Sequence, residues 1–198
     1  MKALLSFFLL GLNIIILSAC STQTKVLCED MKWYQRGVQV ALDGRAKETQ
    51  EEFFGQCLKE GITADRTKYY QGYSYGLKLF CRPDHGYQYG LQGLEYREIC
   101  DLTKRAAFLE KYYLGRKAFL NQEIHEKRRL LHTIGEDIDF KKKLLEDANR
   151  KDFEEWTVPT GNEAGLTGEI NNLNRRKTLI EGEVKLMGNE LSQLGKLK

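Results

Sequence analysis

An apolar repeat near the end of the chain constrains the fold more than any other feature. From Leu166 to Leu194, apolar residues recur at spacings of three and four, and Lys177 alone interrupts the pattern. This spacing places them on one stripe of an α-helix, and a stripe of more than four heptads is typical of a coiled coil. The stripe consists of Leu166, Ile170, Leu173, Ile180, Val184, Met187, Leu191 and Leu194.

A second stripe precedes the first and predicts its partner. It consists of Ile124, Leu131, Ile134, Ile138, Leu145 and Ala148 and is interrupted at Lys127 and Lys141. Between the two stripes, residues 156–162 contain Pro159 and Gly161 and read as a turn. The two arms have similar lengths, about 35 residues or roughly 50 Å as helix. We therefore expect residues 121–198 to form an antiparallel helical hairpin with its turn near 157–162.

The N-terminus has the pattern of a lipoprotein signal peptide. Residues 3–17 are apolar except at Ser6, Gly11 and Asn13, and this run is too short to span a bilayer comfortably. It ends in Leu17-Ser18-Ala19-Cys20, which matches a lipobox. Residues 1–19 would be removed, and Cys20 would carry the acyl chains, palmitate among them, that anchor the chain. The alternatives are an ordinary secretory signal, in which Cys20 is incidental, and an uncleaved anchor.

These features predict a location and exclude one class of partner. Ser21 follows Cys20, where Asp would favour retention at the inner membrane, so we expect an outer-membrane lipoprotein of the bacterial cell envelope that faces the periplasm. Residues 20–27 would be the lipidated tether. The net charge is only +3, which does not suggest a nucleic-acid partner.

The four remaining cysteines predict two disulfides. An even number in an exported chain favours disulfides over a metal site, and no two of them have a Cys-x₂₋₄-Cys spacing. Three pairings are open. Helices expected over 29–42, 48–60 and 65–80 would alternate in direction, which brings Cys28 near Cys57 and leaves Cys81 at the far end. We therefore predict Cys28–Cys57 and Cys81–Cys100.

Tyrosine and glycine dominate the region that holds these cysteines. All ten tyrosines lie between Tyr34 and Tyr113, and the pattern Tyr-x-x-Gly recurs five times. Residues i and i+3 share a helix face, where glycine lets a neighbouring backbone approach closely. Tight helix packing is the favoured interpretation. The alternative is a tyrosine-lined groove for a glycan or another planar ligand, with Tyr73 and Tyr87 as contacts.

The sequence contains no clear catalytic pattern. His132 and Glu136 could form an i, i+4 metal pair, but a zinc site needs three or four ligands and no others are apparent. No nucleophile elbow, phosphate-binding loop or zinc-protease motif is present. We therefore expect no enzymatic activity, no cofactor and no metal.

The order of cysteines, glycines and tyrosines resembles a known family. The shared order is Cys28, Trp33-Tyr34-x-x-Gly37, Asp43-Gly44, Cys57-x-x-x-Gly61, Tyr70-x-Gly72-x-x-x-Gly76-Leu77-x-x-Phe80-Cys81, Gly86-Tyr87-x-x-Gly90-x-x-Gly93-x-x-Tyr96-x-x-x-Cys100, Tyr113 and Gly115. Over residues 20–120 it is similar to bacterial lipoproteins described only as a domain of unknown function. The resemblance implies an exported, cysteine-stapled helical domain and no established activity.

The sequence thus predicts an all-α protein in two parts. A small disulfide-stapled helical domain, residues 28–120, is followed by the hairpin. The expected role is structural or protein-binding, with an envelope protein as partner and Phe153 and Trp156 near the hairpin tip as contacts. The alternative is a module of the Tyr/Gly-rich domain that binds a glycan or a small ligand.

Overall fold

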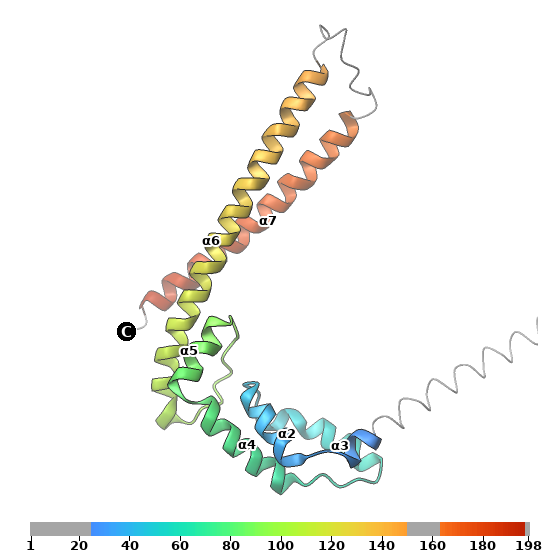
Figure 1. The fold of residues 1–198 in the computed structure, drawn as a ribbon, viewed down its shortest axis with the longest axis vertical. Coiled ribbons are helices and arrows are strands. Elements are labelled where there is room, and N and C mark those ends of the chain that lie inside the picture. The colour runs from blue at the N-terminus through green and yellow to red at the C-terminus, as the bar shows by residue number, and fades with distance from the viewer. Residues whose placement is uncertain (1–24, 150–162, 197–198) are drawn as a thin grey trace, which may run out of the picture. The chain divides into compact units, whose positions relative to one another are not determined.

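The computed structural model describes residues 25–149 and 163–196, and every regular element within them is helical (Figure 1). The prediction of an all-α fold is confirmed. The signal peptide, Cys20 and the tip residues Phe153 and Trp156 lie outside the described residues. The elements are α2 (Trp33–Leu42), the 3₁₀ helix η1 (Lys47–Gln50), α3 (Glu51–Lys59), α4 (Arg66–Phe80), α5 (Pro83–Leu91), α6 (Leu102–Asn149) and α7 (Glu163–Lys196).

The described chain divides into two compact units. The first comprises residues 25–87 and 95–112, and the second comprises residues 88–94, 113–149 and 163–196. Residues 88–94 and 113–120, which we expected in the cysteine-containing domain, thus group with the hairpin. Within this unit, Arg116 donates a hydrogen bond to the carbonyl of Gly93 at 2.6 Å, and the Phe119 ring also lies against Gly93.

Local signals in the sequence set most helix ends. Gly44 and Gly61 follow α2 and α3 with φ of 69° and 78°, a conformation that favours glycine and ends a helix. The carboxylate of Asp65 accepts a hydrogen bond from the Lys68 backbone at 2.9 Å and caps α4. Asp101 caps α6 in the same way through the backbones of Thr103 and Lys104.

Three helix predictions need correction. The first helix was expected from Glu29, but residues 30–32 interrupt it and α2 begins at Trp33. The second helix, expected over residues 48–60, begins instead as the 3₁₀ helix η1, and α3 follows it. Helix α5 was not expected, because a nine-residue segment with two glycines has little intrinsic preference for helix. Pro83 starts it, since proline is favoured at the first position of a helix.

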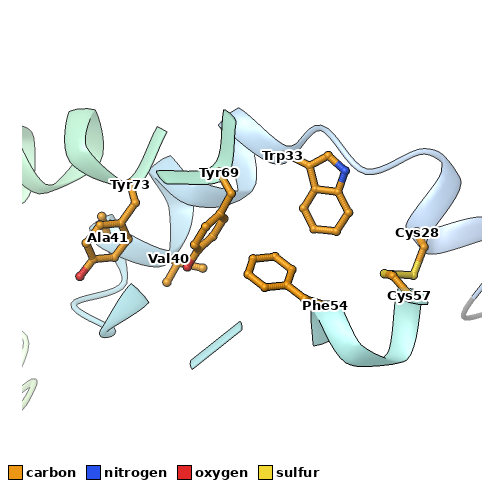
Figure 2. Close-up of a cluster of buried hydrophobic side chains, with 8 residues drawn as sticks. All are labelled: Cys28, Trp33, Val40, Ala41, Phe54, Cys57, Tyr69 and Tyr73. Atoms are coloured by element: carbon orange, nitrogen blue, oxygen red, sulfur yellow. A yellow bond between two sulfur atoms is a disulfide. The ribbon is translucent and has the colours of Figure 1, made fainter. Parts of the chain in front are cut away.

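The core of the first unit is built from aromatic side chains and one disulfide (Figure 2). One buried cluster of this core consists of Cys28, Trp33, Val40, Ala41, Phe54, Cys57, Tyr69 and Tyr73. The disulfides Cys28–Cys57 and Cys81–Cys100 are both present, as predicted. Loops of these lengths stabilise a fold by about 3 kcal/mol each, chiefly by restricting the unfolded chain.

Glycines allow α2 and α4 to cross at backbone contact. A Cβ on Gly37 would lie 2.6 Å from the backbone nitrogen of Tyr73, and one on Gly72 would lie 2.7 Å from the carbonyl carbon of Tyr34. The glycine of Tyr34-x-x-Gly37 also meets the Tyr69 carbonyl, so each motif presents its glycine to the tyrosine backbone of the other. This geometry supports the packing interpretation of the Tyr-x-x-Gly pattern.

The second unit is built on the hairpin of α6 and α7 (Figure 1). All residues of the two apolar stripes are buried or half-buried, and Ile134, Ile138 and Ile170 form a buried cluster within the seam. Lys127 and Lys141, which seemed to interrupt the seam, form ion pairs across it with Glu183 and Glu169, each at 2.6 Å. Fourteen residues separate the two lysines and also the two glutamates, so the antiparallel register is constant over two heptads.

An arginine joins three segments of this unit. The guanidinium of Arg116 forms two hydrogen bonds with Glu190, at 2.6 and 3.0 Å, and a third with the Gly93 carbonyl. It also lies 5.3 Å from the centre of the Phe119 ring. The planar guanidinium suits such two-pronged pairing with a carboxylate. Arg116 therefore connects α6 to α7 and to the segment after α5.

None of the helices in the described ranges has the length and apolar character needed to cross a membrane.

Candidate binding surface on helix α4

The outward face of α4 carries a shallow and widely open surface depression, called the groove below. The residues that line it are Thr67, Tyr70, Gln71, Ser74, Tyr75 and Lys78. All six belong to one helix and all are exposed. The opposite face of α4 holds Gly72 and Gly76, which pack against α2. The groove is therefore the solvent side of the helix that forms the glycine-mediated crossing.

Helical geometry places two tyrosines at the edges of this face. At 3.6 residues per turn, Tyr70 and Tyr75 are separated by about 140° around the helix axis. Gln71, Ser74 and Lys78 fall between them, as does Thr67. The exposed face therefore has an aromatic ring along each edge and polar side chains between the rings.

The Tyr70 side chain is hydrogen-bonded to a carboxylate that belongs to an ion pair. Its hydroxyl donates a hydrogen bond to Glu51 at 3.0 Å, and Glu51 is paired with Arg66 at 2.8 Å. Arg66 in turn lies 4.7 Å from the centre of the Phe54 ring, which belongs to the core. Loss of solvent contact raises the pKa of Tyr70, and the hydrogen bond to the Glu51 carboxylate raises it further. The phenol is therefore protonated at neutral pH and can accept a further hydrogen bond.

At the other edge, Tyr75 packs beside Tyr34 of α2. The two ring centres lie 6.4 Å apart with a tilt of 33° between the planes. Both side chains remain well exposed, Tyr34 at 41% and Tyr75 at 50%. Tyr34 reaches this position because Gly72 lets its backbone lie directly against α4.

The chemistry of the groove suits binding. The exposed rings of Tyr70 and Tyr75 offer flat apolar surface with a polar tip, and Thr67, Gln71 and Ser74 offer neutral donors and acceptors. Lys78 provides one positive charge. No carboxylate, histidine or cysteine lines the groove, so the lining lacks the usual groups for acid–base or nucleophilic catalysis.

Neither of the two tyrosines named from the sequence lines this groove. Tyr73 is only 7% exposed, and its hydroxyl donates to the Arg45 carbonyl at 3.1 Å, so its side chain contributes to the core. Tyr87 is half-buried on α5. Sequence reasoning missed Tyr34, Tyr70 and Tyr75. The positions of Tyr70 and Tyr75 around the helix could have identified them from the sequence. Residues of α4 on the face opposite Gly72 and Gly76 must be exposed to solvent.

The histidines do not assemble a metal site in the described residues. His132 lies 3.5 Å from Glu136, as their spacing suggested, but both side chains are largely exposed. No group of three or more histidine, cysteine or acidic side chains in the described ranges could hold a metal ion. His85 lies beside the Phe80 ring at 4.8 Å, and its partial burial lowers its pKa.

Comparison with known proteins identifies one region of the chain. No curated protein and no solved structure matches the chain. A family model does match, over residues 32–117, and this segment extends from just before α2 into the first third of α6. The hairpin beyond residue 117 lies outside the match. Residues 32–117 are therefore a DUF2799 domain, whose family is described as a protein of unknown function.

Proposed function

We propose that this chain is a lipid-anchored protein of the bacterial cell envelope whose hairpin binds another envelope protein. The anchor would be Cys20, at the end of the lipobox Leu17-Ser18-Ala19-Cys20, on the outer membrane and facing the periplasm. Two disulfides in the first unit suit an oxidising compartment such as the periplasm. The proposed role is binding and not catalysis.

One observation on α7 carries the proposal that the hairpin binds a partner. Leu179 and Leu186 are 64% and 70% exposed, although the seam beside them is closed by its own apolar residues and ion pairs. They are seven residues apart, so they lie on one face of the helix, at the repeat with which helices pack together.

The exposed leucines adjoin the existing helix interface. Each directly precedes a seam residue, Ile180 for Leu179 and Met187 for Leu186, and both of these are half-buried. A helix that covered the leucines would extend the α6–α7 interface. We therefore propose that the partner presents an amphipathic helix to this face of α7. Phe153 and Trp156, near the predicted tip, are a second contact that the sequence suggests.

The test compares two matched double variants of the full chain in cell envelopes. One is Leu179→Gln/Leu186→Gln, and the control is Thr178→Gln/Lys185→Gln, which lies one position earlier at each site and is equally spaced on α7. We expect one envelope protein to co-purify with the wild type and the control, and its yield to fall about tenfold with the leucine variant.

Two outcomes would contradict the proposal. One is equal recovery of the partner with both variants. The other is recovery of a second copy of this chain in place of a different protein, which would assign the face to self-association. Equal helical content and equal unfolding midpoints for the two variants would show that the hairpin itself is intact.

A further inference from the structure

The groove on α4 differs in chemistry from the leucine face of α7 and belongs to the other unit. Its side chains are aromatic or polar, without a single aliphatic residue. In the described part of the chain, no hydrogen bond or ion pair engages the side chains of Gln71, Ser74 and Lys78. These polar groups are therefore available to a ligand.

The composition of the lining favours one class of ligand. Protein interfaces are centred on clustered anchors, tyrosine among them, that lose solvent together on binding; here the two tyrosines lie about 140° apart and polar side chains separate them. A nucleic acid needs several cations along its backbone, and Lys78 is the single cation of the lining. A sugar ring, in contrast, has an apolar face that can lie on a tyrosine and hydroxyl groups that can bond to amides and hydroxyls.

The arrangement of the tyrosines adds to this chemistry. Tyr70 is held by Glu51 at one edge, and Tyr75 is packed against Tyr34 at the other, so both rings are positioned before a ligand arrives. From Thr67 to Lys78 the face extends roughly 16 Å along the helix, longer than a single sugar. Lys78 stands at one end of this face.

We propose that the outward face of α4 binds an oligosaccharide that bears a carboxylate. Tyr70 and Tyr75 stack on its sugar rings, Gln71 and Ser74 bond to its hydroxyl or amide groups, and Lys78 pairs with its carboxylate. In the proposed location, peptidoglycan is the nearest polymer with this chemistry. The assignment is independent of the hairpin proposal, because it uses other residues in the other unit.

The experiment measures binding of the full chain, purified in detergent, to two probes by calorimetry. The probes are an acidic disaccharide-tetrapeptide released from peptidoglycan and neutral tetra-N-acetylchitotetraose. Tyr75→Gln should weaken both interactions about tenfold, the effect of losing one stacked ring, while Tyr75→Phe should bind like the wild type. Lys78→Gln should weaken the acidic probe alone.

Tyr87→Gln is the matched control, since Tyr87 is a partly exposed tyrosine of the same unit that lies outside the groove. It should leave binding unchanged. The proposal is overturned if the wild type binds neither probe, or if Tyr75→Gln and Tyr87→Gln weaken binding equally. It is also overturned if Lys78→Gln affects the two probes alike. Thermal unfolding of each variant separates loss of binding from loss of fold.

Discussion

Gly72 of α4 lies against the backbone of Tyr34 in α2 so closely that a Cβ at Gly72 would approach the Tyr34 carbonyl carbon to 2.7 Å. No side chain fits between two backbones at this distance, and neither backbone can yield without moving its helix. The same contact sets the position of the Tyr34 ring beside Tyr75. One glycine thus links the packing of the first unit to the shape of its outer surface.

The first prediction tests this crossing. Gly72→Ala should lower the free energy of unfolding by about 3 kcal/mol, because the added methyl group must push α2 and α4 apart. Gly55→Ala in α3 is the matched control, since nothing lies within 4 Å of the Cβ it would add. That change should be neutral or stabilising by up to about 1 kcal/mol. Urea unfolding measures both, and equal stability of the two variants would refute the close crossing.

The second prediction concerns Arg116, whose side chain is only 19% exposed. Arg116→Met leaves Glu190 and the Gly93 carbonyl without this donor, and we expect a loss of about 2 kcal/mol in the free energy of unfolding. Arg129→Met is the control, because Arg129 is exposed and, among the described residues, forms an ion pair with Glu126 of its own helix alone. It should cost less than about 0.5 kcal/mol. A loss for Arg129→Met as large as that for Arg116→Met would contradict this role.

The third prediction concerns the disulfides. Peptide mapping of the oxidised chain without reductant should recover Cys28 linked to Cys57 and Cys81 linked to Cys100. Replacing either pair by alanine should cost about 3 kcal/mol, since each closes a loop of moderate length. Recovery of a cross-pairing, such as Cys57 with Cys81, would show that the first unit is assembled differently.

The fourth prediction is a dependence of stability on pH. Burial lowers the pKa of His85 below its ordinary value of 6.5, although a hydrogen bond with the Phe80 backbone and the nearby Asp84 carboxylate oppose the shift. The unfolded state therefore binds the proton more readily, and stability should fall as the pH decreases below about 6.5. His85→Gln should reduce this fall. His132→Gln, which alters a largely exposed histidine, should retain it, and identical profiles for the two variants would count against the assignment.

The fifth prediction concerns the membrane anchor. Cells given labelled palmitate should incorporate the label into the wild type and not into Cys20→Ala. The label reports the modification directly, because the acyl chains would be attached to Cys20. Equal incorporation of label into the variant and the wild type would contradict lipidation at Cys20.

Features that depend on local sequence were predictable. The heptad stripes of Ile134, Ile138 and Ile170 specify a hairpin because the repeat alone determines which face of each helix is apolar. The disulfide pairing followed from the expected directions of three short helices. Asp65 marked the start of a helix because a carboxylate at that position satisfies free backbone donors.

Features that depend on helix register were not predictable. Lys127 and Lys141 read as breaks in the seam, because no property of α6 reveals that Glu183 and Glu169 stand opposite them. Tyr69 and Tyr70 are adjacent in the sequence, yet one is buried and the other lines the groove. Only the contact of α2 with α4 decides between them, and that contact joins residues more than thirty positions apart.

The most direct test of the proposed function is site-specific photocrosslinking in living cells. A photoreactive residue placed at Leu179 or at Leu186 of the full chain should capture the same envelope protein from both positions. Placed at Thr178 or Lys185, about 100° around the same helix, it should not capture that protein. Capture of that protein from all four positions, or of none from the leucine positions, would contradict a partner-binding face on α7.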